Sequence, residues 1–199
     1  MTNQELIIQR FHDSLEVKKS VAENAEIIEC IDAAAREIAG AIRRGGKLVL
    51  CGNGGSASDA LHFAGEIVGR FQAERSAWPA VVLNADVATL TAIANDYGYD
   101  DVFARQAEGH ITDKDVFVGI STSGNSINII RAIEVAKNKG AKTVGLLGKD
   151  GGKISGMVDY PIVVRSDVTA RVQESHICII HILCEIIENS LKYYSNPTE

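Results

Sequence analysis

The sequence predicts an α/β fold: a three-layer sandwich in which helices cover both faces of a five-stranded parallel sheet, with a helical extension at the N-terminus. Its short apolar runs do not alternate with polar residues, which is typical of strands buried on both faces of a parallel sheet. Amphipathic stretches separate most of these runs, as helices do in α/β proteins. The 199 residues are 46% hydrophobic and 23% charged. This length and composition fit a single domain over residues 1–199.

The first part of the chain is predicted to form two helices, roughly 4–22 and 24–44, that pack on an α/β core of residues 46–199. Apolar side chains recur at helical spacing in the second helix, at Ile27, Ile31, Ala34, Ile38 and Ala41. The Gly45-Gly46 pair that follows is a typical helix stop.

The core is predicted to contain five strands and a final helix. The strands are the apolar runs at 47–51, 80–83, 116–120, 143–147 and 161–164. The last helix, about 170–194, carries isoleucine, leucine and cysteine on almost every face, which is typical of a helix that is buried on all sides. In a domain of this size, we expect another subunit to supply the second covering surface.

The overall composition argues against several classes of function. The net charge is −6 and no basic face is visible, so a nucleic-acid partner is not expected. The polar N-terminus lacks the apolar core of a signal peptide, and no apolar run reaches membrane-spanning length. We therefore expect a cytoplasmic protein with no membrane partner. Four scattered cysteines without a CxxC pair indicate free thiols rather than disulfides or a thiolate metal site: Cys30, Cys51, Cys178 and Cys184.

Two loops have the composition of an anion site. Gly52–Asp59 is rich in glycine, Ser121–Ser126 is rich in hydroxyl side chains, and each loop follows a strand and opens a helix. Glycine lets the backbone approach a ligand, and the amides at a helix N-terminus attract anions. Hydroxyls with free amides suit a phosphate monoester. Tight turns with helix N-caps are the alternative, but two such loops at the carboxyl ends of parallel strands favour a ligand site.

The first loop also allows a different interpretation. Gly52-x-Gly54-x-x-Ala57 matches the dinucleotide-binding fingerprint, and Asp86 lies past the end of the next strand. A dinucleotide site would leave the serine-rich loop unexplained, and the chain is short for a dehydrogenase with a substrate domain.

A candidate metal or acid–base cluster lies on the predicted helices. His62 and Glu66 share one helix face, an arrangement that suits a divalent metal such as zinc, a base with a proton donor, or a plain surface pair. Glu66 is also spaced to form an ion pair with Arg70. Gln173 and His181 are about 12 Å apart along an ideal helix. Both reach one metal only if that helix begins irregularly or if two subunits share the site.

Three other polar positions stand out. His181 lies on an apolar helix, where a polar group needs a metal, a substrate or a hydrogen-bond partner. His176 is expected to be a buried or interfacial histidine without a chemical role. Asn95 and Asp96 are expected in a loop, where they would contact sugar hydroxyls.

Together these motifs resemble one family. They are Cys51–Ser56, His62-x-x-x-Glu66, Asn95-Asp96, Ser121–Ser126, Gly148–Gly152 and Arg171-x-Gln173 followed by His181. The chain resembles the phosphoheptose isomerases, the sedoheptulose 7-phosphate isomerase branch of the sugar isomerase (SIS) domain proteins, over nearly its whole length. The resemblance implies a SIS-type, flavodoxin-like sandwich that assembles as a homotetramer with active sites between subunits.

The resemblance also implies a role for each motif. The phosphate would be held by Ser121, Thr122, Ser123 and Ser126. The sugar would be bound by Asn53, Gly54, Gly55, Ser56, Asn95 and Asp96, with Glu66 and Gln173 also in contact with the substrate. Zinc would be bound by His62, Glu66, Gln173 and His181. Glu66 and His181 would be the acid–base pair that converts sedoheptulose 7-phosphate to D-glycero-D-manno-heptose 7-phosphate, a precursor of lipopolysaccharide heptose.

The sequence leaves two related functions open. Some SIS-domain relatives bind the bacterial replication initiator without isomerase chemistry, but such a protein needs neither Glu66 nor His181. The other is isomerisation of a different sugar phosphate, because a phosphate loop does not distinguish sugars by length.

Overall fold

The computed structural model describes residues 1–192, which form eight α-helices, five strands and one short 3₁₀ helix. In chain order the elements are α1 (Asn3–Ala22), α2 (Ala25–Arg43), β1 (Leu48–Gly52), α3 (Gly55–Val68), β2 (Ala80–Val82), α4 (Val87–Tyr97), η1 (Tyr99–Asp101), α5 (Val102–His110), β3 (Val116–Ser121), α6 (Ile127–Asn138), β4 (Lys142–Gly148), α7 (Gly152–Ser155), β5 (Tyr160–Val164) and α8 (Thr169–Leu191). The expected strands and N-terminal helices lie within one residue of their predicted bounds. The predicted end of the last helix, residue 194, lies outside the described residues.

The five strands form one parallel sheet, as predicted, and their order is β2-β1-β3-β4-β5. Every residue of β1 and β3 is buried, which explains why their apolar runs do not alternate with polar residues. The chain moves outward from β1 to β2 in one direction and from β3 to β5 in the other. The direction of winding therefore reverses between β1 and β3, which is where open α/β sheets bind their ligands.

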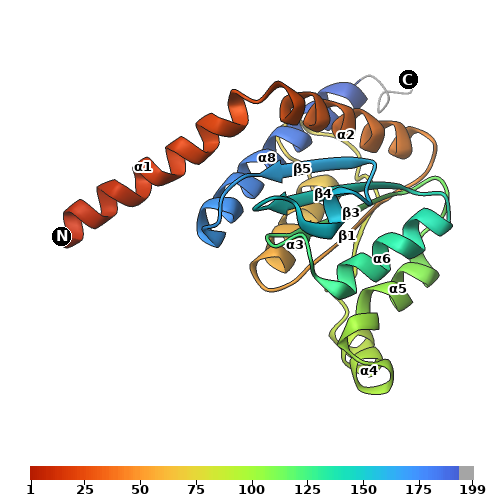
Figure 1. Cartoon of the computed structure of the whole chain (residues 1–199). Coiled ribbons are helices and arrows are strands. Elements are labelled where there is room, and N and C mark those ends of the chain that lie inside the picture. Colours follow the sequence, from red (N-terminus) through yellow and green to blue (C-terminus); the bar gives the residue numbers. More distant parts are fainter. Residues whose placement is uncertain (193–199) are drawn as a thin grey trace.

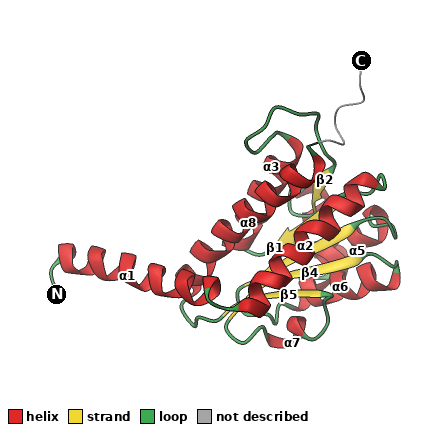
Figure 2. Ribbon diagram, turned by 90° about the horizontal axis from the view of Figure 1, so that it is seen from above, coloured by secondary structure: helices red, strands yellow, loops and turns green. Residues whose placement is uncertain are grey.

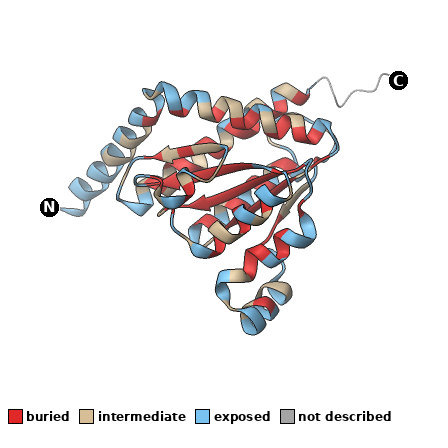
Figure 3. Cartoon of the chain, turned by 45° about the vertical axis from the view of Figure 1, so that its right-hand side comes forward, coloured by how far each residue is buried: buried red, intermediate tan, exposed pale blue. Residues whose placement is uncertain are grey.

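Helices cover both faces of this sheet, which confirms the three-layer sandwich (Figure 1). One apolar cluster joins α2, α3 and α8 to the sheet face that carries Leu50, Val118 and Leu146. A second cluster joins α5 and α6 to the face that carries Val49 and Phe117. Figure 3 shows the buried residues concentrated in the strands and in the helix faces turned toward them.

The two N-terminal helices differ in how much of their length packs on the core. α2 buries a row of apolar side chains against the sheet and α8. α1 extends away from the body of the molecule (Figure 2), and only its last turns reach the core, through Val17 and Val21. Its remaining apolar side chains are exposed because no other part of the described chain covers them: Leu6, Ile7, Ile8, Phe11 and Leu15.

The last helix is buried along most, but not all, of its surface. α8 packs against α2, α3 and the end of α1, whereas Ile182 is 42% exposed. One apolar face of α8 therefore stays open within a single chain, on a helix for which a second subunit was predicted. Within residues 1–192, no helix has the length and apolar character needed to cross a membrane. All four cysteines are free, as expected.

Candidate active site

The two predicted ligand loops lie side by side at the reversal point of the sheet. β1 ends at Gly52 and pairs with Ile120 of β3, so the loops after these strands begin next to each other. Gly54 has a φ of +57°, a backbone conformation that disfavours any side chain, and α3 begins directly after it. The sequence therefore places a helix N-terminus and a second, serine-rich loop at one edge of the sheet.

An amide pair fastens the two loops together. Asn53 Nδ2 donates to Asn128 Oδ1 at 3.0 Å, and Asn128 Nδ2 donates back to Asn53 Oδ1 at 3.0 Å. Tyr99 Oη also donates to Asn53 Oδ1, at 2.9 Å. The Asn53 side chain therefore shapes the site. Sequence reasoning missed Asn128 and Tyr99, and the only signal was an asparagine two residues into α6, where a buried amide must find a partner.

The serine-rich loop brings three of its hydroxyls together. Ser121 Oγ lies 3.0 Å from Ser126 Oγ and 3.4 Å from Ser123 Oγ. Ser126 stands at the N-terminus of α6, where helix amides and the helix dipole favour an anion. Thr122, the fourth predicted phosphate residue, is half-buried in the same turn. This cluster has the donors and acceptors that a phosphate monoester requires.

The loop after β4 supports the serine-rich loop from behind. Gly124 has a φ of +65°, and a side-chain carbon there would lie 2.0 Å from the main-chain oxygen of Gly151. A carbon on Gly148 would lie 2.4 Å from the main-chain oxygen of Thr122. The Lys153 amide donates to Asn125 Oδ1 at 3.1 Å. These close contacts explain two glycines of the Gly148–Gly152 motif, Gly148 and Gly152, because side chains at these positions would collide with the serine-rich loop.

Gln173 lies against the start of α3. A side-chain carbon on Gly55 would lie 2.1 Å from Gln173 Nε2, so the amide occupies the space that a side chain at position 55 would fill. Ser56, the next residue, is buried. The structure therefore places Gln173 beside the glycine-rich loop, which is the position that a substrate contact at this loop would need.

His62, Glu66 and His181 form a second group farther along α3. The Nε2 atoms of His62 and His181 are 2.9 Å apart, and His62 Nε2 is 3.4 Å from Glu66 Oε1. The His62 side chain is 41% exposed and that of Glu66 is 24% exposed, so both remain accessible to a ligand. The ring of Phe71 stacks on His181 with centroids 5.7 Å apart. Arg70, the alternative partner of Glu66, instead pairs with Glu74 at 3.6 Å.

Asp59 is a further acidic group that sequence reasoning missed. It lies one helical turn before His62, and its Oδ2 atom is buried without a hydrogen-bond partner in the described part of the chain. Burial raises the pKa of this carboxyl above its ordinary value, and the nearby His62 opposes the shift. The i,i+3 spacing of Asp59 and His62 was the available signal.

The four predicted metal ligands do not meet within one chain. α8 is regular from Thr169, so the irregular start that would bring Gln173 to His181 is absent from the helix as described. Eight residues separate the two along the helix, or about 12 Å. Among residues 1–192, no group of three or more His, Cys, Asp or Glu side chains is arranged to hold a metal ion. The facing nitrogens of His62 and His181 are nevertheless close to the separation of about 3.3 Å expected for two ligands of one tetrahedral zinc.

Asn95 and Asp96 lie in the last turn of α4 and not in a loop, which corrects the prediction. The apolar residues of this segment continue with helical spacing, and the helix ends only at Gly98, whose φ is +96°. Asn95 Nδ2 donates to Asp96 Oδ1 at 2.8 Å, and both residues are exposed. Asp86, the acidic residue of the dinucleotide interpretation, accepts a hydrogen bond from the Thr89 amide as the N-cap of α4.

His176 is fully buried, as expected for a histidine without a chemical role. Its Nε2 lies 3.0 Å from the main-chain oxygen of Leu147, which joins α8 to β4. Burial lowers the pKa of His176 to about 4, although the hydrogen bond to Leu147 opposes this shift.

Known proteins share both this fold and this sequence. The SIS domain family matches residues 11–148. The phosphoheptose isomerase of Geobacter sp. (strain M21) is 52% identical over 166 residues, which are 83% of this chain and 86% of that protein. The chain belongs to the phosphoheptose isomerase family of SIS-domain proteins. The phosphoheptose isomerase of Sulfurimonas denitrificans is 49% identical over 185 residues, 93% of this chain and 95% of that protein.

A solved phosphoheptose isomerase has the same architecture. The enzyme from Neisseria gonorrhoeae superposes with a TM-score of 0.89 at 40% identity, covering 94% of this chain and all of that one. Family membership identifies the chain as a sugar-phosphate isomerase.

Proposed function

We propose that this phosphoheptose isomerase family member converts sedoheptulose 7-phosphate to D-glycero-D-manno-heptose 7-phosphate, in the synthesis of heptose precursors for lipopolysaccharide and related glycans. The observation that carries the proposal is the grouping of His62, Glu66 and His181 on the α3–α8 pair, whose N-terminal ends lie beside the serine-rich loop. Relatives named for this activity match the chain at about half identity over most of its length.

Substrate binding follows from the charge and polarity of the two loops. The phosphate is bound by the hydroxyls of the serine-rich loop and by the free N-terminus of α6: Ser121, Thr122, Ser123 and Ser126. The sugar is bound by the glycine-rich loop, by Gln173 and by the end of α4: Asn53, Gly54, Gly55, Ser56, Asn95 and Asp96. Tyr99 connects the last of these segments to the glycine-rich loop through Asn53.

Glu66 and His181 carry the proton transfers between the first two sugar carbons. In the forward direction one of them removes a proton from C1 while the other protonates the carbonyl oxygen on C2, which gives an enediol. The proton on the C1 oxygen is then removed and a proton is returned to C2, so the aldose forms without any net loss or gain of atoms. Both residues border His62, and the Glu66 side chain is 24% exposed beside it.

Zinc is the metal that we propose for this site. When bound, it would supply positive charge that stabilises the enediolate. His62 and His181 would provide two nitrogen ligands, with Glu66 beside them and Gln173 as the fourth. Since Gln173 is about two helical turns from His181 in one chain, the set is complete only where two copies share the site.

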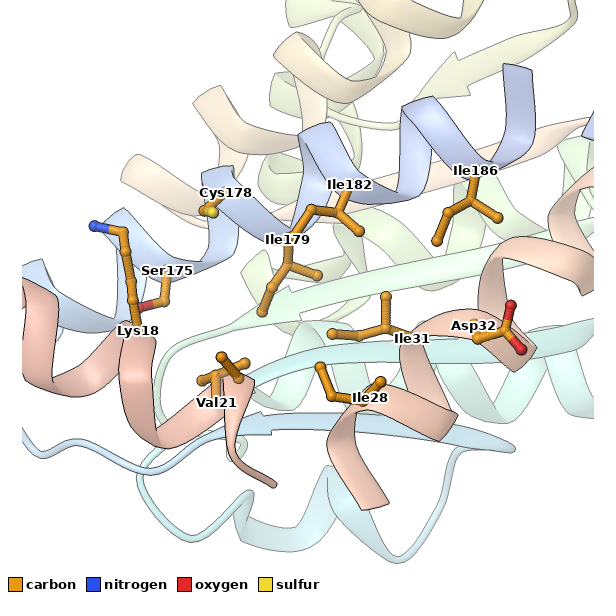
Figure 4. Close-up of a pocket in the computed structure, with 11 residues that line it drawn as sticks. Lys18, Val21, Ile28, Ile31, Asp32, Ser175, Cys178, Ile179, Ile182 and Ile186 are labelled. Carbon is orange, nitrogen blue, oxygen red and sulfur yellow. The ribbon is translucent and has the colours of Figure 1, made fainter. Parts of the chain in front are cut away.

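We propose that the protein is a cytoplasmic homotetramer. Lys18 and Val21 of α1, Ile28 and Ile31 of α2 and three isoleucines of α8 line an apolar groove of about 320 Å³ (Figure 4). The exposed apolar residues of α1 continue from this groove. Contiguous apolar surface of this kind is typical of subunit interfaces, and a second copy of this chain would cover it.

The test is turnover of sedoheptulose 7-phosphate, followed as formation of the aldose, before and after chelation and with zinc restored. We expect turnover that falls with the chelator, returns with zinc and is lost in Glu66→Gln. Exposed Glu185→Gln on α8 is the matched control and keeps wild-type turnover. Turnover that survives chelation would contradict the zinc proposal alone. Turnover of another sugar phosphate in place of the heptose would contradict the substrate assignment, and no turnover at all would contradict the isomerase.

A further inference from the structure

A single buried carboxylate holds the segment between α3 and β2 against α8. The Glu188 side chain is 8% exposed and accepts four hydrogen bonds. Its Oε2 accepts from the amides of Gln72 at 3.0 Å and Ala73 at 2.8 Å. Its Oε1 accepts from the amide of Phe71 at 3.4 Å and from Arg75 Nε at 3.2 Å. Three successive amides that point at one anion form a nest, a geometry that is built around a negative charge.

Arg75 joins the same carboxylate to the helix that carries the acid–base group. Its Nη2 donates to the main-chain oxygen of Glu66 at 2.8 Å. Its guanidinium lies 3.6 Å from the centre of the Trp78 ring, which fixes its plane. Burial by itself raises the pKa of Glu188, but the amides and Arg75 outweigh burial and hold that pKa below its ordinary value. Glu188 is therefore ionised at neutral pH, and the pair is a buried salt bridge.

A buried salt bridge is weak evidence for a stabilising role, because desolvation offsets most of the attraction between the charges. Its contacts indicate a different role. Phe71, the first residue of the nest, stacks its ring on His181 at an interplanar angle of 29°. Arg75 binds the main chain of Glu66. Arg75 thus contacts Glu66 directly, whereas Glu188 is joined to His181 through Phe71.

We propose that Glu188 and Arg75 are positioning residues that set the separation and orientation of Glu66 and His181. Glu188 acts on His181 through Phe71, whereas Arg75 acts on Glu66 through its main-chain oxygen. This inference rests on the proposed isomerase function and adds to it two residues that contact neither the proton-transfer atoms nor the phosphate loop. A misplacement of about 1 Å in a catalytic group lowers a rate up to about 100-fold. Loss of the Glu188–Arg75 pair is therefore expected to slow the chemical step.

The test compares four substitutions in the intact protein. Glu188→Gln keeps the size of the side chain but turns one acceptor into a donor that faces other donors, and Glu185→Gln, on the exposed face of α8, is its control. Phe71→Leu removes the ring but leaves the amide nest in place, and Phe71→Tyr restores the ring. For each variant we would measure kcat and KM for the sugar phosphate. We would also record the imidazole C–H resonance of His181, one of only five histidines, by NMR.

We expect Glu188→Gln and Phe71→Leu to lower kcat about 10- to 100-fold with KM within about twofold of wild type, and to shift the His181 resonance as the stacked ring moves away. Glu185→Gln and Phe71→Tyr should keep wild-type values. If Glu188→Gln does not fold, the Phe71 pair decides alone. A wild-type kcat and an unmoved His181 resonance in Phe71→Leu overturn the inference. If the wild type itself lacks turnover, the proposed function is wrong. The His181 resonance in the Glu188 and Phe71 variants then still shows whether these two residues orient His181.

Discussion

At the scale of single residues, Gly55 shows how the absence of a side chain defines the site. The Gln173 amide occupies the space where a side-chain carbon would lie, 2.1 Å away. We expect Gly55→Ala to displace Gln173 from the glycine-rich loop and to lower kcat/KM at least tenfold, mainly through a higher KM. Gly65→Ala in the same helix is the control, because nothing lies within 4 Å of an added carbon there. Steady-state kinetics of the two variants test this, and equal kcat/KM values would show that Gln173 does not contact the substrate.

Residue identities alone predicted the positions of the glycine-rich and serine-rich loops and the proximity of His62 and Glu66, because these signals lie within a few positions of each other in the sequence. The long-range contacts were not predictable in the same way. Asn53 and Asn128 are 75 positions apart, and Arg75 and Glu188 are 113 apart. Their pairing depends on which strands become neighbours and on how α8 lies across α3. A sequence read without its fold does not identify the partner in either contact.

At the scale of elements, α8 organises the molecule. Along one helix it carries Gln173 toward the glycine-rich loop, His176 toward β4, His181 toward His62 and Glu188 toward the segment after α3. The sequence indicated that this helix is unusually apolar, but its polar residues proved to be the informative ones. Gln173 and His181 both face α3, His176 faces β4, and Glu188 faces the segment after α3. By contrast, Asn95 and Asp96 were expected in a loop because they are a polar pair, although they lie in the last turn of α4.

The attachment of α8 to β4 makes stability depend on pH. Because the pKa of buried His176 is lowered to about 4, the unfolded chain binds a proton at this residue between about pH 6.5 and pH 4 while the folded chain does not. The free energy of unfolding therefore decreases as the pH falls through this window, by on the order of 3 kcal/mol. We expect His176→Asn to be less stable at pH 7 and to lose this part of the pH dependence.

Urea denaturation at intervals between pH 4 and pH 7 measures the effect. Exposed His110→Asn serves as the control and should retain the wild-type slope. Three carboxylates also have a lowered pKa in the folded chain: Glu188, Asp115 and Asp159. Their protonation in acid therefore also lowers the free energy of unfolding. Only the difference between the two histidine variants therefore reports on His176, and identical slopes would contradict the assignment.

At the scale of the whole molecule, α1 is the feature that a single chain leaves unexplained. The sequence predicted this helix correctly, but a predicted helix does not reveal whether its apolar side chains meet the same chain or another one. The structure shows α1 extended from the body (Figure 1), with Arg171 of α8 donating to the main-chain oxygen of Arg10 at 2.9 Å. The helix is thus held in a definite direction while its apolar side chains remain uncovered.

If α1 is a subunit interface, a charge on its apolar face must separate the subunits. Phe11 is 69% exposed and lines an apolar hollow with Ile7 and Leu15. We expect Phe11→Asp to reduce the mass in solution, measured by sedimentation equilibrium, because burying an unpaired carboxylate in an apolar interface is strongly unfavourable. Isomerase activity should fall together with the mass, since the proposed zinc site needs Gln173 from a second copy.

His12→Asp is the control for this substitution. It adds the same charge at the neighbouring exposed position, which does not line the hollow, and should leave the mass and the activity unchanged. A Phe11→Asp protein of wild-type mass would place the subunit interface elsewhere, and a smaller but fully active protein would show that one chain completes the site by itself.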